Sequence, residues 1–194
     1  VGAGTFPGGN PANVTLFVDG RAQNLGLSLT QGLDFQGMYA LDTASAGTFT
    51  FSASGTYLFK HEVAITAIAP LVDRLNTIFN PLEFKLRAGV DWQLGAARAS
   101  VTAQHVNGYT NTAITPSENV GSYTPIDVAF SWNFGDSSWS PLDDLVVGFE
   151  VRNAFDEDPP YVNIAPTANG SGGYDATASN PVGRLFAVSL RKKW

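Results

Sequence analysis

Few of the side chains that perform chemistry in proteins stand in a working arrangement in this sequence. The two histidines, His61 and His105, are far apart, and the chain has no cysteine. A zinc site needs several His or Cys ligands, and a catalytic triad needs a nucleophile beside its histidine. The glycine clusters at 1–10 and 169–173 lack the following helix and lysine of a phosphate-binding loop. We therefore expect no enzymatic activity, with no catalytic, metal or cofactor site.

A short acidic cluster is the remaining candidate for cation binding. Asp156, Glu157 and Asp158 are consecutive carboxylates, and oxygen ligands suit hard cations. Two prolines follow at once, and no spaced set of further acids completes a binding loop. We favour a structural role that closes the top of a strand, with Asn153 hydrogen-bonding the local backbone at the bend.

Composition excludes several classes of protein and favours one. The 194 residues carry a net charge of −6, and only 14% of them are charged, against about 25% in a typical soluble domain. The acidic balance argues against a nucleic-acid partner, and the absence of cysteine excludes a disulfide scaffold. No apolar run reaches the ~18 residues of a transmembrane helix, and Val1 does not open a signal peptide. Low charge without such a run is typical of a transmembrane β-barrel.

The elements that must carry any site are strands, because apolar and polar residues alternate over long segments. A weaker run from Val14 to Val18 predicts one more strand, which gives about eight. The first long segment far exceeds the ~5–6 residues of a soluble strand, whereas membrane-spanning strands need ~9–11. A soluble sandwich would also alternate, and it stays as an alternative. The alternating segments are 25–41, 49–59, 82–94, 97–103, 126–134, 145–151 and 186–194.

Charge placement and connections refine this prediction. Charged residues in the segments fall on the polar face, where we expect them to form a cross-strand ion network or to face a plug. Lys192, near the chain end, could snorkel to headgroups. Short and long connections alternate, as they do in outer-membrane barrels. An apolar spacing close to helical over 64–79 predicts a short helix in an outer loop. The expected network comprises Glu83, Lys85, Arg87, Asp91, Arg98, Glu150 and Arg152.

Large aromatic residues recur near the ends of the segments, as an interfacial girdle requires. At the end with short turns we expect this girdle to contain Tyr39, Trp92, Trp132 and Phe134, with Trp194 at the chain end. At the other end the candidates are Tyr57, Phe59, Phe84, Tyr109 and Phe155.

The C-terminal part of the chain carries a specific series of motifs. It contains Asn153, Phe155, Asp156, Pro159 and Pro160, then Gly173-Tyr174-Asp175, then Asn180-Pro181-Val182-Gly183-Arg184 before a final strand that ends in Trp194. Upstream, Asn24-Leu25-Gly26, Gln31-Gly32-Leu33-Asp34, Asn80-Pro81, Arg87-Ala88-Gly89-Val90-Asp91-Trp92 and Asn107-Gly108-Tyr109 extend the pattern. In these features the chain resembles the C-terminal part of the β-barrel of TonB-dependent outer-membrane receptors.

The resemblance implies an all-β fold: an antiparallel transmembrane barrel whose full form has about 22 strands around a plugged lumen. It implies the outer membrane of a Gram-negative bacterium, and lipid and the TonB system as partners, the latter through a plug domain. Such receptors take up siderophore-iron, cobalamin or oligosaccharides. We expect 1–194 to be the C-terminal segment, without plug or signal peptide, and not competent for transport alone. Its eight strands would form an open curved sheet or a self-closed small barrel, the latter with a structural or adhesive role.

The resemblance also gives the last strand a second role. A terminal aromatic residue after alternating apolar residues is similar to the signal read by the outer-membrane barrel assembly machinery. Phe186, Val188, Leu190 and Trp194 would carry this signal, and an edge strand of this kind can add to another sheet edge.

Overall fold

The computed structural model describes residues 26–66, 68–135, 141–166 and 172–192, and within these ranges the fold is all-β and contains no helix. No helix long and apolar enough to span a membrane occurs in this part of the chain. The segment around Val14 lies outside the described residues. The strands are β1 (Leu27–Thr43), β2 (Gly47–Ala64), β3 (Val72–Asp73), β4 (Phe84–Leu94), β5 (Ala97–Val106), β6 (Tyr109–Asn111), β7 (Glu118–Val120), β8 (Ile126–Asn133), β9 (Leu145–Arg152) and β10 (Leu185–Lys192).

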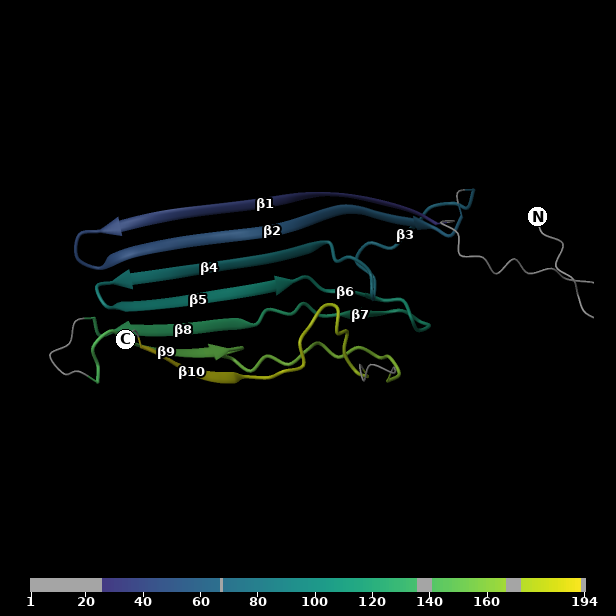
Figure 1. The fold of residues 1–194 in the computed structure, drawn as a ribbon. Coiled ribbons are helices and arrows are strands. Elements are labelled where there is room, and N and C mark those ends of the chain that lie inside the picture. The colour runs from purple at the N-terminus through teal and green to yellow at the C-terminus, as the bar shows by residue number, and fades with distance from the viewer. Residues whose placement is uncertain (1–25, 67, 136–140, 167–171, 193–194) are drawn as a thin grey trace, which may run out of the picture.

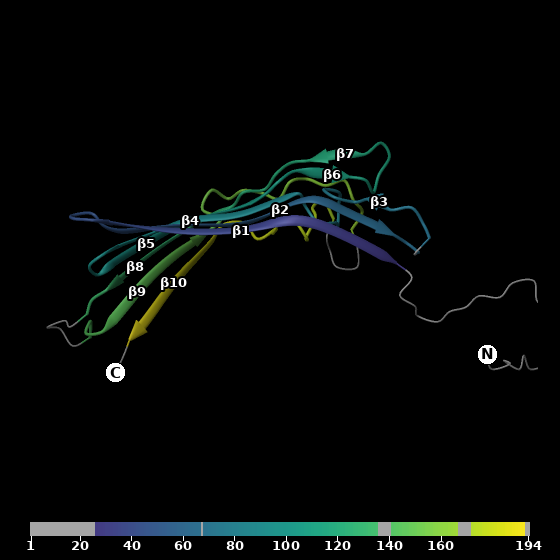
Figure 2. The same ribbon diagram turned by 90° about the horizontal axis from the view of Figure 1, so that it is seen from above.

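The strands form one large antiparallel sheet of eight strands, in the order β1-β2-β4-β5-β8-β9-β10, with β3 added beside β2. Strands β1, β4, β8 and β10 run toward one end and β2, β5 and β9 run back (Figure 1). The connections at the first end, here the turn end, are shorter than those at the opposite or loop end. The predicted alternation of short and long connections is confirmed. Seen from above, the sheet is a single twisted and curved layer with β6 and β7 at the loop end (Figure 2).

The strand register gathers the apolar residues of all seven long strands on one face. One row of directly opposed residues crosses the whole sheet without a polar member. Phe130, Trp132 and Phe149 are 44%, 43% and 45% exposed, so this face is not the core of a sandwich. The row consists of Leu41, Phe49, Trp92, Ala99, Phe130, Phe149 and Val188.

A β-bulge marks the upper limit of this apolar face. The register of β1 and β2 shifts between Gln31 and Gly32, which leaves one extra residue in β2. Beyond the shift, Lys60 lies opposite Gln31 and Glu62 opposite Leu29, so both charges occupy the face that is apolar below. Their side chains form an ion pair of 3.0 Å. The separation of charge from the apolar face therefore ends at the bulge.

The buried core of the described residues lies among the long loops and not under the sheet. It consists of Ile78, Leu82, Tyr109, Val120 and Val162. Three long connections meet there, and their packing fixes the loop end of the sheet.

The helix predicted over 64–79 is wrong. Strand β2 continues to Ala64, β3 pairs back onto it, and Asn76 and Phe79 have positive φ angles of 57° and 61°, which a helix does not allow. Ile68 is 98% exposed, while Ile78 is buried against the other loops. The apolar spacing reflects packing between loops that are distant in sequence, which a helical period cannot represent.

Candidate functional site at the polar face and the strand tops

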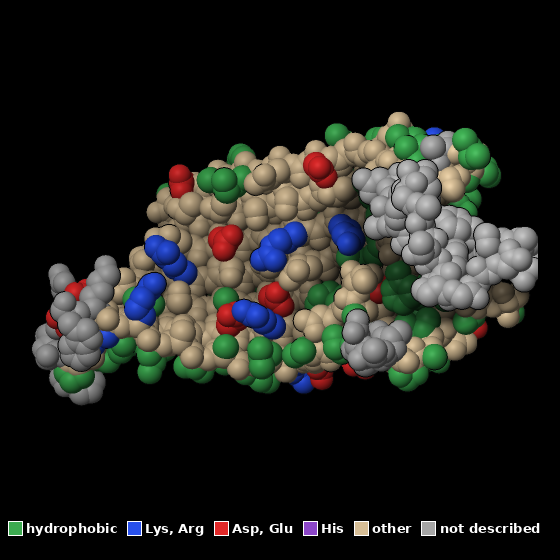
Figure 3. All heavy atoms as spheres, turned by 45° about the vertical axis from the view of Figure 1, so that its right-hand side comes forward, with side chains coloured by type: hydrophobic (Ala, Val, Ile, Leu, Met, Phe, Trp, Pro, Cys, Tyr) green, Lys and Arg blue, Asp and Glu red, His purple; other side chains and the backbone are tan. Residues whose placement is uncertain are grey.

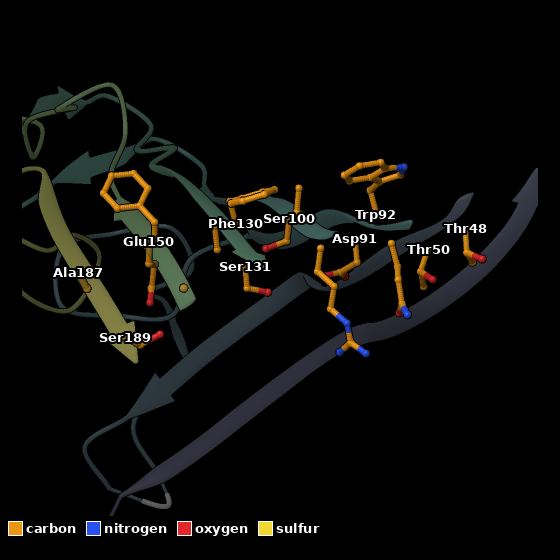
Figure 4. Close-up of a pocket in the computed structure, with 16 residues that line it drawn as sticks. Thr48, Thr50, Asp91, Trp92, Ser100, Phe130, Ser131, Glu150, Ala187 and Ser189 are labelled. Atoms are coloured by element: carbon orange, nitrogen blue, oxygen red, sulfur yellow. The ribbon is translucent and has the colours of Figure 1, made fainter. Parts of the chain in front are cut away.

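The face opposite the apolar one is polar and charged. Figure 3 shows Lys, Arg, Asp and Glu side chains spread over this face, with hydrophobic side chains mainly along its margins. In the close-up of Figure 4, Asp91, Ser131 and Glu150 point to one side of the sheet, and Trp92 and Phe130 point to the other. Below the bulge, the alternation in the sequence therefore becomes a division of apolar and polar side chains between the two faces.

The polar face is hollowed in two places. One hollow, shown in Figure 4, is lined by polar side chains that include Thr50, Asp91, Arg98, Glu150 and Ser189. The second lies nearer the loop end, where the chain from 176 to 183 faces Arg87, Asp127 and Arg152. Both hollows offer charge and hydrogen-bonding groups to water, a polar ligand or another protein segment.

The expected cross-strand ion network on this face is not present among the described residues. The close pair there, between the Glu150 Oε1 and Arg152 Nε atoms at 2.7 Å, lies within one strand. The reason is the register: Lys85 lies opposite Thr56, and Asp91 lies opposite Thr50 and Ser100. Lys85 and Asp91 therefore meet hydroxyl groups instead of opposite charges, and the strands are joined by bonds such as Thr56 Oγ1 to Asp34 Oδ1 at 2.5 Å.

The acidic cluster at the top of β9 contacts the entries of two further strands. Asn153 is buried, with a φ of 48°, and its amide side chain both donates to Glu157 O and accepts from Glu157 N, at 2.9 Å each. Asp156 Oδ1 accepts a hydrogen bond from the backbone N of Arg184 at 2.7 Å. Glu157 Oε1 accepts one from the backbone N of Thr124 at 3.0 Å. Residues 153–157, here the strand-top clip, therefore connect the starts of β8 and β10 to the end of β9.

The clip does not gather metal ligands. In the ranges that the structure describes, no three His, Asp or Glu side chains lie close enough together to hold a metal ion. Phe155 is exposed, whereas Pro159 and Pro160 are half-buried. The carboxylates of Asp156 and Glu157 are used for backbone hydrogen bonds.

The aromatic residues expected at the turn end lie near that end of the sheet. Tyr39, Trp132 and Phe134 are exposed, and the Trp92 Nε1 atom donates a hydrogen bond to Ala46 O at 2.7 Å in the hairpin turn. The indole N–H group of Trp92 is therefore satisfied within the turn, while its ring lies on the apolar face.

At the loop end, the aromatic residues divide into two groups. Tyr57, Phe59 and Phe84 form ring contacts with centroid distances of 6.1–6.3 Å. Tyr109, predicted to join such a girdle, is instead 5% exposed within the loop core. Its place in sequence next to a strand end did not reveal that two further loops cover it.

A buried carboxylate at the loop end was not found by sequence reasoning. Asp175 is 1% exposed and accepts hydrogen bonds from the backbone N and hydroxyl of Thr177 and from the backbone N of Phe79. Burial first, and the Asp175 charge second, raise the pKa of the Tyr109 phenol well above its usual value. The available signal was an aspartate two residues before a threonine, a typical Asx-turn pattern.

The last strand presents the residues expected to carry the assembly signal. Phe186, Val188 and Leu190 lie on the apolar face of β10, at one edge of the sheet, and all three are exposed. Trp194 lies outside the described residues.

Comparison with known proteins yields matches among solved structures alone. No family model and no curated protein matches the chain. Two crystal structures of variants of the ferric enterobactin receptor PfeA from Pseudomonas aeruginosa match with a TM-score of 0.53 at 17% identity. In each case the match covers 84% of this chain and 22% of the receptor chain. The chain is thus an antiparallel all-β sheet similar to part of the barrel of a TonB-dependent receptor.

Proposed function

We propose that this chain forms part of the outer-membrane barrel wall of a TonB-dependent receptor that takes up a scarce nutrient in a Gram-negative bacterium. The observation that carries the proposal is the unbroken apolar face, which crosses all seven long strands and has no protein partner among the described residues. The opposite face, charged and hollowed, would line the lumen and face a plug domain.

The height of the apolar face supports a position in the bilayer. In β4 the face extends from Phe84 to Leu94, which corresponds to about 33 Å along the strand at ~3.3 Å per residue. With a tilt of about 45°, this gives roughly 25 Å, the height of the apolar band of an outer-membrane barrel. Lys60 and Glu62, beyond the bulge, would then lie outside the hydrocarbon layer.

Strand direction argues against direct pairing of β1 with β10 in the alternative, a self-closed small barrel with a structural or adhesive role. Strands β1 and β10 run in the same direction (Figure 1), so joining them directly would create a parallel pair, whereas neighbouring strands of single-chain bacterial barrels are antiparallel. Strand β1 has 17 residues and β10 has 8. Pairing the two would leave much of the β1 edge unsatisfied, at several kcal/mol for each group in hydrocarbon.

The identity of the nutrient is also a proposal. The structural neighbour is named for ferric enterobactin, and we propose a ferric siderophore first, with cobalamin and oligosaccharide as the other ligands of such receptors. Loops and plug would bind the ligand, and TonB would act through the plug. The chain itself would supply wall, loops and the terminal strand, without enzymatic activity.

Depth-dependent fluorescence quenching tests the membrane position. Two variants are placed in lipid vesicles, and in both of them Trp139 and Trp194 are replaced by Phe. One variant keeps Trp92 and replaces Trp132 by Phe, and the other keeps Trp132 and replaces Trp92 by Phe. Both should be quenched more strongly by lipids brominated near the headgroup than by lipids brominated near the chain end. No quenching by any brominated lipid would contradict the proposal.

The receptor itself is tested on the complete gene. The reading frame upstream of Val1 should encode a plug domain, whereas a signal peptide joined directly to Val1 would support the small barrel. A strain that lacks the complete gene should lose uptake of one ferric siderophore when iron is scarce, and a copy restored in trans should recover it.

A further inference from the structure

We propose that Asp156 sets the register of the terminal strand β10, and thereby fixes which side chains of β10 face outward. Asp156 is part of the strand-top clip, and β10 begins one residue after Arg184, the residue whose backbone Asp156 binds. The carboxylate acts as a fixed acceptor at the entry to the strand.

The backbone around this contact is shaped for it. Asp156 has a φ of 58°, a left-handed conformation that Asp tolerates better than most residues. A Cβ atom on Gly183 would lie 2.9 Å from Asp156 Oδ1, so glycine at that position leaves room for the carboxylate. Without a side chain at residue 183, the Asp156 carboxylate can come close enough to the chain to accept the 2.7 Å hydrogen bond from the backbone N of Arg184.

A second series of contacts connects the strand-top clip to the first outward side chain of β10. The Arg184 guanidinium lies 3.7 Å from Asp156 Oδ2, and its Cζ atom lies 5.8 Å from the centre of the Phe186 ring. Phe186, the first outward residue of β10, stacks on Phe149 of β9 at 6.2 Å. Asp156 and Phe186 are thus connected through one arginine.

The pattern of β10 does not fix its register. A slip of one residue would exchange the two faces, but a slip of two would not. After a two-residue slip, the outward positions would still hold Phe186, Val188 and Leu190, and the inward ones Ala187 and Ser189. Within the described residues β10 is an edge strand that pairs with β9 alone, so a contact at its entry can distinguish these registers.

The consequence for membrane assembly rests on the proposed function. If β10 is read by the assembly machinery, Asp156 decides where Phe186, Val188 and Leu190 stand when the strand is presented. The register itself can be measured whether or not that function holds.

Disulfide cross-linking tests the register, because residues 1–194 contain no cysteine. The full-length protein is prepared from cell membranes in two double-cysteine forms. One replaces Val147 and Leu190, which are directly opposite in the structure. The other replaces Val147 and Val188, which would be opposite after a two-residue slip. Cysteines at Val101 and Val128 of β5 and β8 report the remaining fold. The backgrounds are the unchanged chain, Asp156→Gly, Asp156→Asn, Gly183→Ala and Asp158→Gly. Gly accepts the positive φ and removes the carboxylate, Asn keeps an acceptor oxygen, and Asp158 is an exposed neighbouring acid.

We expect the 147–190 cross-link to fall at least threefold in Asp156→Gly and Gly183→Ala, with a corresponding rise in the 147–188 cross-link. Asp156→Asn and Asp158→Gly should keep the native pattern. Unchanged 147–190 cross-linking in Asp156→Gly would overturn the proposal. If the 101–128 cross-link shows that Asp156→Gly does not fold, Gly183→Ala decides in the same way. Absence of the protein from the outer-membrane fraction, with native cross-links, would count against the proposed function and leave the register role intact.

Discussion

The Asp175 carboxylate accepts a hydrogen bond from the backbone N of Phe79 at 3.4 Å, which joins the last long loop to the first. Asp175 and Tyr109 of β6 are both buried where three long loops meet, and burial first, then the Asp175 charge, raise the pKa of the Tyr109 phenol. One side chain therefore acts on all three loops at the loop end of the sheet.

Replacing Asp175 with Asn should loosen all three loops together. An amide presents one acceptor and one donor where the carboxylate presents two acceptors, so at least one hydrogen bond from Thr177 or Phe79 is lost. Leaving a buried donor unsatisfied costs about 1–3 kcal/mol. Hydrogen exchange should accelerate in 76–82, 109–111 and 172–179, while the exposed Glu118→Gln variant should change none of them. Acceleration confined to 172–179 would show that Asp175 does not link the loops.

The Tyr109 phenol gives the loop core a dependence on alkaline pH. Its pKa is raised in the folded loops, by burial first and by Asp175 second, so the folded state favours the neutral form. The stabilisation is fully present below the unfolded pKa of about 10 and is lost as the pH rises through the raised folded value. Protection of 109–111 from hydrogen exchange, corrected for the intrinsic rate, should fall above about pH 10. In the Tyr109→Phe variant this loss of protection above about pH 10 should disappear. If the variant loses protection to the same extent, another titrating group causes the loss.

Two glycines on the apolar face should respond oppositely to a methyl group. A Cβ atom on Gly55 would lie 2.6 Å from both Lys85 O and the Phe35 ring, whereas one on Gly37 would meet nothing within 4 Å. Gly55→Ala should destabilise the sheet by about 1–3 kcal/mol through overpacking. Gly37→Ala should be neutral or stabilising by up to about 1 kcal/mol. Urea unfolding midpoints in lipid vesicles compare the two, and equal shifts would contradict the close packing of Phe35 over Gly55.

Adjacent positions on β8 should separate the lipid face from the lumen face. Val128 belongs to the apolar face, and Ala129, the next residue, belongs to the polar face. The Val128→Arg substitution should lower the free energy of unfolding by about 2–4 kcal/mol if that site lies near the bilayer midplane. The Ala129→Arg substitution should lower it far less. The folded fraction in lipid vesicles, read from heat-dependent gel mobility, measures both. Equal costs would mean that neither face contacts hydrocarbon.

The sequence alone determined the strands, their two faces and the alternation of short and long connections. These features follow from a period of two residues, and each strand carries that period in its own residues. The structural use of Asn153 and its acidic neighbours was also predictable, because an Asn at a bend followed by prolines is a local pattern.

Only the tertiary structure decided how distant segments meet. The bulge at Gln31, the absence of a helix over 64–79 and the burial of Tyr109 and Asp175 all depend on partners elsewhere in the chain. The ion network failed for the same reason, since the register that puts Lys85 opposite Thr56 is set by pairing along whole strands. Local periodicity fixes which face a side chain joins, but the neighbour that it meets there is fixed by pairing and loop packing over long sequence separations.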